Sequence, residues 1–282
     1  MSKELGKAVL KELGISEKDI DRIKDVPYQE LYNAGQRAMA ASIGTRRPGT
    51  PMMWGFGPTP DGEVVLQQPF QPGFADISSN VPLLIGTTFN ELQRLNYNRN
   101  ITLEQARTEL QRTFADETDA YIDAFAEAYP DYTPQDLLSI DWLFRPKTII
   151  TADYVAKSRK AKTYTYMFTW RSPINKGSVH GNELNFCFNT LERAGNELPQ
   201  PTEQDYELAD IMSSVWAQFA KTGNPNIKEL PKWKAYTAKN GEMMIFDYNC
   251  EIRNNPDRKL EEIIDRHCFK QLDEFRKKQA GK

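Results

Sequence analysis

Two short stretches of the chain place an ionisable side chain just beyond a strand-like run. The stretch GTTFNE ends at Glu91, and the stretch GSVHGNELNFCF contains His180. An imidazole can act as a general base near neutral pH, and a neighbouring carboxylate holds its tautomer and stabilises the imidazolium. Glu91 and His180, in this chain order, fit the last two members of a nucleophile–acid–base series. Spacing alone leaves a second interpretation open, in which Glu91 is an ordinary exposed side chain after a strand.

The nucleophile that would complete such a triad is not evident. No Gly-x-Ser-x-Gly motif occurs in the 282 residues. Ser178 is too close along the chain to His180 for the imidazole to activate its hydroxyl without an unusual turn. Cys187 lies between two phenylalanines, which favours a packed thiol over a reactive one. We therefore expect that this chain alone does not complete the reaction.

Strands separated by helices predict an α/β sheet with mainly parallel neighbours. Residues 81–88 form a short apolar run bounded by turn residues, and residues 163–170 alternate strictly between two faces. Residues 243–248 read as a last strand. Three strands make a thin sheet, so we expect at least one uncovered apolar edge.

The chain reads as a single portion of one domain in three stretches. Residues 1–40 are a helical lead-in, and Ser16 to Asp19 resemble a capping box for a second helix. Residues 41–75 contain a long loop region, and residues 76–282 carry the strands and the two candidate loops. The remaining helical patterns cover residues 102–114, 146–160, 205–222 and 259–278. Residues 133–136 place a cap, an N1 proline and an acidic N3 residue at the start of another helix.

Composition narrows the classes of partner. The net charge of −3 gives no general attraction to nucleic acid or anionic lipid, and the apolar runs are too short to span a bilayer. No secretory signal is evident at the beginning of the chain. The three cysteines have no CxxC spacing, although a disulfide between Cys250 and Cys268 stays open.

Four further features can be interpreted either as structural or as functional. Glu183 could pair with His180 on a metal, but capping or orienting the loop is favoured. His267 and Cys268 could ligate a metal, but packing is favoured, and the basic tail reads as a solvated end. Aromatic residues near the acid loop could line a substrate pocket or simply pack; they are Trp54, Phe56, Phe70, Phe74 and Phe89.

Several segments, in order, resemble the C-terminal half of the type-B carboxylesterases, the cholinesterase-like and para-nitrobenzyl esterase-like branch of the α/β-hydrolase fold. The segments are PTPDGEVV (58–65), DISSNVPLLIGTTFNE (76–91), VHGNELNFCF (179–188) and VWAQFAKTGNPN (215–226). The resemblance implies that the acidic triad residue falls on Glu91 and the catalytic histidine on His180. The family's nucleophile serine lies in a Gly-x-Ser-x-Gly elbow upstream of the matching region.

The resemblance implies hydrolysis of small-molecule carboxylic esters without a metal or organic cofactor. We then expect an expressed fragment, a split-gene product or a truncated gene product that is inactive alone. Its expected partner is an N-terminal half paired along the sheet edge, or a second copy through the same edge. The alternative is a non-catalytic interaction module of cholinesterase-like fold, although such a module has no need of Glu91 or His180.

Overall fold

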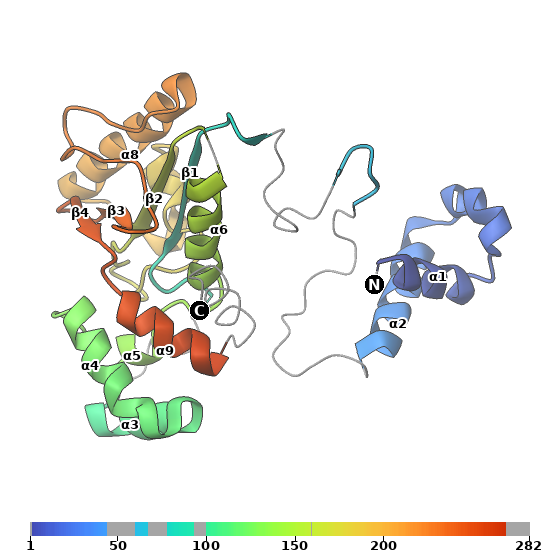
Figure 1. The fold of residues 1–282 in the computed structure, drawn as a ribbon, viewed down its shortest axis with the longest axis horizontal. Helices are drawn as coiled ribbons and strands as arrows, with labels where there is room; N and C mark the ends of the chain where they lie inside the picture. Colours follow the sequence, from blue (N-terminus) through green and yellow to red (C-terminus); the bar gives the residue numbers. More distant parts are fainter. Residues whose placement is uncertain (1, 44–59, 67–77, 93–99, 159, 269–282) are drawn as a thin grey trace. The chain divides into compact units, whose positions relative to one another are not determined.

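The computed structural model describes residues 2–43, 60–66, 78–92, 100–158 and 160–268. The chain divides into an N-terminal unit, Met1–Pro72, and a C-terminal unit, Gly73–Lys282. The C-terminal unit holds the β-sheet and both candidate loops (Figure 1).

The described part of the N-terminal unit is helical. It contains α1 (Ser2–Glu12), a 3₁₀ segment η1 (Glu17–Asp25) and α2 (Tyr28–Ile43). The predicted capping box at the start of the second helix is wrong. The Ser16 hydroxyl donates to the Asp19 carboxylate at 2.6 Å and caps no backbone N–H, so the segment winds as 3₁₀ turns.

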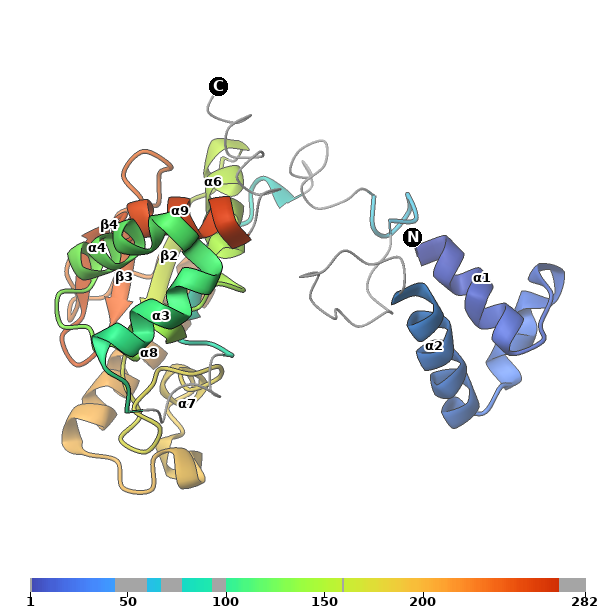
Figure 2. The same cartoon turned by 90° about the horizontal axis from the view of Figure 1, so that it is seen from below.

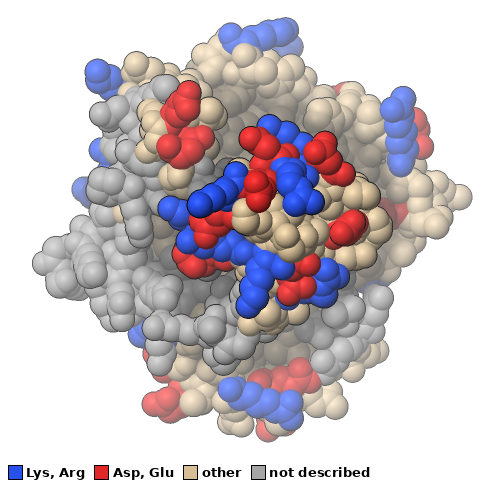
Figure 3. Space-filling model, turned by 90° about the vertical axis from the view of Figure 1, so that its right-hand side faces the viewer, with Lys and Arg blue, Asp and Glu red and all other residues tan. Residues whose placement is uncertain are grey.

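Charges on this unit are mixed in sign. Lys7 pairs with Glu17 at 3.3 Å, and Arg37 pairs with Glu12 at 2.7 Å. Acidic and basic side chains intermingle on the face that Figure 3 shows. Exposed pairs of this kind contribute little to stability, so they mark a solvated surface.

In the part of the chain that the structure describes, the sheet has four strands in the order β1-β2-β3-β4. They are β1 (Leu83–Thr88), β2 (Thr163–Phe168), β3 (Glu242–Phe246) and β4 (Glu251–Asn254). β1, β2 and β3 are parallel neighbours, as predicted, and β4 is antiparallel to β3. The strand predicted at residues 243–248 is present as β3, but it is not the last one, because the polar edge strand β4 follows it.

Helices connect and cover the strands (Figures 1 and 2). The connection from β1 to β2 contains several helices, and α7 and α8 lie between β2 and β3. The helices are α3 (Leu103–Phe114), α4 (Thr118–Ala128), α5 (Asp136–Ser139), α6 (Arg145–Ser158), α7 (Leu184–Cys187), α8 (Glu203–Thr222) and α9 (Arg258–Cys268). Three further 3₁₀ turns are η4 (Ala115–Glu117), η5 (Leu191–Arg193) and η6 (Gly195–Glu197).

Two apolar cores lie on opposite faces of the sheet, as strand alternation requires. Met167 and Ile245 pack on one face with α3, α4, α6 and α9. Phe168 and Phe246 pack on the other face with α7 and α8. The sheet is therefore the middle layer of an α/β/α arrangement, and it holds the ends of β1 and β2 in fixed positions.

Helix ends follow their sequence signals where those signals are strong. Thr102 and Gln105 form the predicted capping box of α3, and α8 ends at Gly223, whose φ is 69°. The predicted closing helix is present as α9, while residues 269–278 lie outside the described part of the chain. None of the helices in the described ranges has the length and apolar character needed to cross a membrane.

Candidate active site

The carboxyl ends of β1 and β2 bring the two candidate loops together. The Phe89 N–H donates to the Phe168 carbonyl at 2.9 Å, which continues the ladder beyond the strands. Glu91 and Val179 then form an isolated parallel bridge, and the His180 N–H donates to the Glu91 carbonyl at 2.9 Å. Backbone hydrogen bonds, and not side chains alone, therefore fix the distance between the two loops.

Glu91 and His180 form a direct side-chain pair. His180 Nδ1 lies 2.5 Å from Glu91 Oε2. The Glu91 side chain is 8% exposed and the His180 side chain is 57% exposed. Glu91 Oε1 also accepts the Thr88 N–H at 2.8 Å. An anchored, buried carboxylate thus orients an accessible imidazole through Nδ1, which leaves Nε2 as the nitrogen for proton transfer.

The backbone at Glu91 adopts an uncommon conformation. Its φ is 43°, in the left-handed region that non-glycine residues seldom occupy. The Thr88 hydroxyl accepts the Glu91 N–H at 3.0 Å and closes the turn. Such strain persists only where surrounding contacts hold it, and it is concentrated at functional sites. Here it turns the carboxylate back toward Thr88 and His180.

Asn90 joins three loops and was not predicted as a site residue. Its side chain is fully buried. Its Nδ2 donates to the Ser139 carbonyl at 2.9 Å, and its Oδ1 accepts the Ser178 N–H at 2.8 Å. Its own N–H donates to the Ser178 carbonyl at 2.9 Å. The only signal in the sequence is that a short amide side chain directly precedes Glu91.

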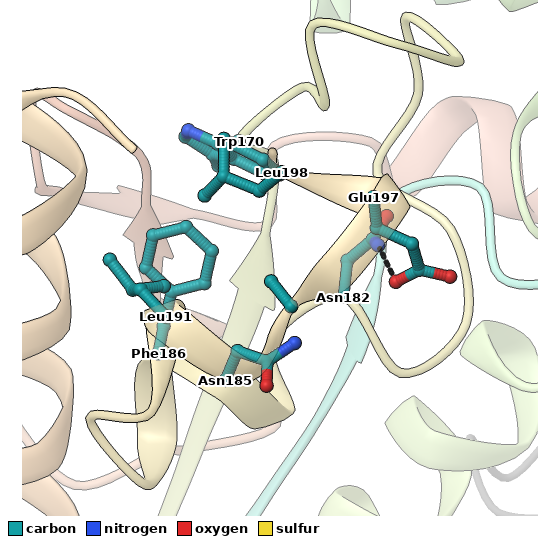
Figure 4. Close-up of a pocket in the computed structure, with 8 residues that line it drawn as sticks. Trp170, Asn182, Asn185, Phe186, Leu191, Glu197 and Leu198 are labelled. Carbon is teal, nitrogen blue, oxygen red and sulfur yellow. Dashed lines mark hydrogen bonds between the residues drawn. The ribbon is translucent and has the colours of Figure 1, made fainter. Parts of the chain in front are cut away.

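Asn182 makes two hydrogen bonds that stabilise the loop carrying His180. Its Oδ1 accepts the Val179 N–H at 2.8 Å, and its Nδ2 donates to Glu197 at 3.1 Å, as Figure 4 shows. A small pocket opens beside this bond; it is lined by Trp170, Asn182, Asn185, Phe186, Leu191, Ala194, Glu197 and Leu198. Because neither Glu91 nor His180 lines it, the pocket belongs to the support of the loop and not to a substrate cavity.

The two substitute nucleophiles are both packed. The Ser178 side chain is buried, and its hydroxyl donates to the Phe168 carbonyl at 2.7 Å. Burial, reinforced by the charge of Glu183, raises the pKa of the Cys187 thiol to about 12. A thiol that stays protonated at neutral pH is a poor nucleophile. The prediction that Cys187 is a packed thiol is confirmed.

Glu183 has a buried carboxyl group close to the pair. Burial raises its pKa, and the charge of Glu91 raises it further. Of the predicted capping or loop-orienting role, capping is wrong, because Glu183 is the N-cap of α7 but its side chain makes no capping hydrogen bond. Within the described ranges, its Oε2 is buried and has no hydrogen-bond partner.

The other candidates lie away from the pair. His267 Nε2 lies 2.6 Å from the Glu117 carboxylate, and its ring packs edge-on against Phe114. Phe89 packs in the core against Phe125 and Tyr129. The three cysteines are free, and no cluster of three metal-ligating residues occurs in the described ranges. The other four aromatic residues of the predicted pocket, Trp54, Phe56, Phe70 and Phe74, lie outside the described residues.

Comparison with known proteins identifies relatives of this chain. A sequence profile described as the carboxylesterase family matches residues 2–263. The para-nitrobenzyl esterase of Bacillus subtilis (strain 168) is 29% identical over 266 residues, which are 89% of this chain and 50% of that protein. Carboxylesterase 1E of Rattus norvegicus is 31% identical over 127 residues, covering 41% of this chain and 21% of that protein.

Solved structures give the same result. An esterase from Clostridium hathewayi, described as able to hydrolyze aliphatic aromatic polyesters, superposes with a TM-score of 0.79 at 28% identity. The match covers 93% of this chain and 52% of that structure. A carboxylesterase of Geobacillus stearothermophilus, at 24% identity and a TM-score of 0.61, shares the fold over 92% of this chain. The chain spans about half the length of the relatives that it matches over most of its own length.

Proposed function

The chain belongs to the carboxylesterase family, with an α/β-hydrolase fold, and we propose that it supplies the acid and the base of a Ser–His–Glu carboxylesterase. The observation that carries the proposal is the 2.5 Å contact between the buried Glu91 carboxylate and Nδ1 of the exposed His180 ring. The pair lies at the carboxyl ends of parallel strands, where sites assemble in α/β sheets.

We propose a distinct role for each side chain of the pair. His180 Nε2 takes the proton of a serine hydroxyl as the serine attacks an ester carbonyl, and it then returns the proton to the leaving alcohol. Glu91 holds the proton-bearing Nδ1 and stabilises the imidazolium between these steps. Water activated by the same nitrogen then releases the acid.

We propose that the serine comes from a segment other than these 282 residues, because they contain no Gly-x-Ser-x-Gly. We propose that this segment adds a strand to β1. Among the described residues β1 pairs only with β2, and its outer edge therefore offers backbone groups for strand addition. A serine-bearing polypeptide that docks there would approach the ends of the two candidate loops.

Side chains near the pair support a covering partner. Leu92, Leu184 and Phe188, on or beside the two loops, are 51%, 51% and 71% exposed. Exposed apolar side chains grouped at one site indicate an interaction surface. The buried Oε2 of Glu183 would also gain a donor there, since buried carboxylate oxygens are normally hydrogen-bonded.

A fused enzyme tests the assignment of Glu91 and His180. The serine-bearing half of the Bacillus subtilis para-nitrobenzyl esterase is joined in front of this chain, and hydrolysis of p-nitrophenyl acetate is measured. We expect activity in the fusion and a loss in kcat of about 10⁴-fold for His180→Ala or Glu91→Gln, as for other triads. Glu192→Gln, at an exposed residue of η5, is the matched control and should retain full activity.

Two results contradict the proposal. One is a soluble, folded fusion whose kcat is the same with and without His180. The other is a fusion in which Glu91→Gln behaves like Glu192→Gln, because a carboxylate with no role in orienting the imidazole could lose its charge at no cost.

A further inference from the structure

The imidazole of His180 contacts an aromatic ring from a distant part of the chain. The ring centroids of Phe144 and His180 lie 5.8 Å apart, with 17° between the ring planes. This distance and tilt are those of an offset stack, an arrangement that aromatic pairs favour. The bond to Glu91 fixes one nitrogen of the imidazole but does not by itself fix the plane of the ring. A stacked neighbour restrains that plane.

The segment that carries Phe144 is tightly held. The carboxylate of the buried Asp141 accepts the N–H groups of Leu143 at 2.8 Å, Phe144 at 3.1 Å and Arg145 at 2.8 Å. The Asp141 N–H itself donates to the Phe89 carbonyl at 2.9 Å. The loop that presents Phe144 is therefore tied to the same strand end as Glu91.

A buried ion pair anchors the other side of Phe144. Arg145 Nε and Nη2 donate to the two carboxylate oxygens of Asp257 at 2.6 and 2.7 Å, and both side chains are 3% exposed. The Tyr129 hydroxyl donates to the same carboxylate at 2.7 Å. Because separating a buried, bidentate pair costs several kcal/mol, Arg145 cannot easily swing outward. Phe144 is held between two fixed neighbours.

We propose that Phe144 is a positioning residue for His180: it fixes the plane of the imidazole so that Nδ1 stays on Glu91 while Nε2 points away from it. A cation within about 6 Å of an aromatic centroid is also attracted to the ring face, so the stack stabilises the imidazolium formed during proton transfer. The inference rests on the proposed function, because a fixed imidazole matters only to an acid–base pair. Its geometry can be tested without any ester hydrolysis.

Nuclear magnetic resonance of ¹⁵N-histidine-labelled protein tests the proposal. The chain has two histidines, so His267→Gln assigns the signals of His180. The ring nitrogens report which of them carries the proton, and the carbon-bound ring protons report the field of the neighbouring Phe144 ring. Phe144→Tyr keeps the stack, whereas Phe144→Leu removes it. Phe188→Leu, at a phenylalanine that is 71% exposed, is the matched control.

We expect the wild type, Phe144→Tyr and Phe188→Leu to keep the proton on Nδ1 with the same shifts of the ring protons. Phe144→Leu should lose the ring-proton shifts and populate both tautomers. Unchanged His180 signals in a folded Phe144→Leu protein would overturn the proposal, as would Tyr failing to preserve them. If Leu unfolds the chain, Phe144→Met replaces it under the same criteria. An inactive fused enzyme with an intact stack would instead reject the proposed function alone.

Discussion

At the scale of single residues, Glu91 and His180 differ in their surroundings in the way that an acid–base pair requires. The carboxylate is buried and held by the Thr88 N–H, while the imidazole is more than half exposed. A buried, oriented acceptor keeps the proton on Nδ1, and an accessible Nε2 can reach a reacting group. The left-handed backbone of Glu91 makes this possible because it turns the carboxylate back over the strand end.

Asn90 should be the residue on which the site most depends for its shape. Asn90→Ala leaves the Ser178 N–H and the Ser139 carbonyl without their buried partner. We expect the free energy of unfolding to fall by about 2–4 kcal/mol, since each unsatisfied buried group costs about 1–3 kcal/mol. Urea unfolding of the variant and the wild type at neutral pH measures this change in the free energy of unfolding.

The control for this change is Asn196→Ala on the exposed η6 turn, where a surface substitution should stay within about 0.5 kcal/mol. Equal stabilities of the two variants would show that Asn90 does not tie the loops together.

The strand pattern alone left Glu91 open as an ordinary exposed residue, and the resemblance to the type-B carboxylesterases singled out Glu91 and His180 as a pair. The sequence could not indicate Phe144, since nothing local distinguishes this ring from the other phenylalanines. Its contact with His180 depends on where the loop before α6 returns to the sheet. The fully buried Asn90 likewise gains its role only from Ser139 and Ser178, which are distant in the chain.

At the scale of elements, the parallel pair β1–β2 sets the geometry of the site. Gly86 lies opposite Tyr166 in the register, and a Cβ at Gly86 would collide with the Tyr166 ring and carbonyl. The close approach of the two strands therefore needs glycine at this position. The same register places Thr88 beside Phe168, and the loops to Glu91 and His180 continue from there.

The strands with a strong pattern were predictable, and the weakly patterned elements were not. β1 is an apolar run and β2 alternates, so their positions follow from residue type. β4 is polar and gains its hydrogen bonds from β3, which no local signal reveals. η1 carries a cap-like Ser16, but its side chain bonds Asp19 instead of the backbone.

The η4–α9 contact should make stability depend on acid pH. Arg266 and His267 on α9 bond the Glu117 carboxylate and lower its pKa from 4.5 to about 2. The ionised carboxylate is therefore favoured in the folded state. Its contribution is present above the unfolded pKa of 4.5 and is lost as the pH falls from there toward 2.

Glu117→Gln should accordingly lower the free energy of unfolding by about 1 kcal/mol at pH 7, near the upper end for partly exposed pairs. The difference from the wild type should shrink below pH 4.5 and vanish near pH 2. Thermal unfolding across this range measures it, with Glu192→Gln as the control. A difference that stays constant with pH would show that the carboxylate is not selectively stabilised in its ionised form.

At the scale of the whole molecule, the Glu91–His180 pair and the edge of β1 that is unpaired among the described residues belong to the C-terminal unit. Both follow from β1, which is the outermost strand of the described sheet and leads directly to Glu91. The chain spans about half the length of the relatives that it matches most fully. The apolar side chains exposed near the pair are what a covering, serine-bearing segment would bury.

We propose that this chain carries the acid and the base of an esterase but not its nucleophile. Hydrolysis of a short-chain p-nitrophenyl ester is to be measured for the purified chain alone and for its His180→Ala variant. We expect equal rates, both at the level of the buffer. Hydrolysis by the chain that disappears in His180→Ala would contradict it, because a nucleophile within the 282 residues would then be working with His180.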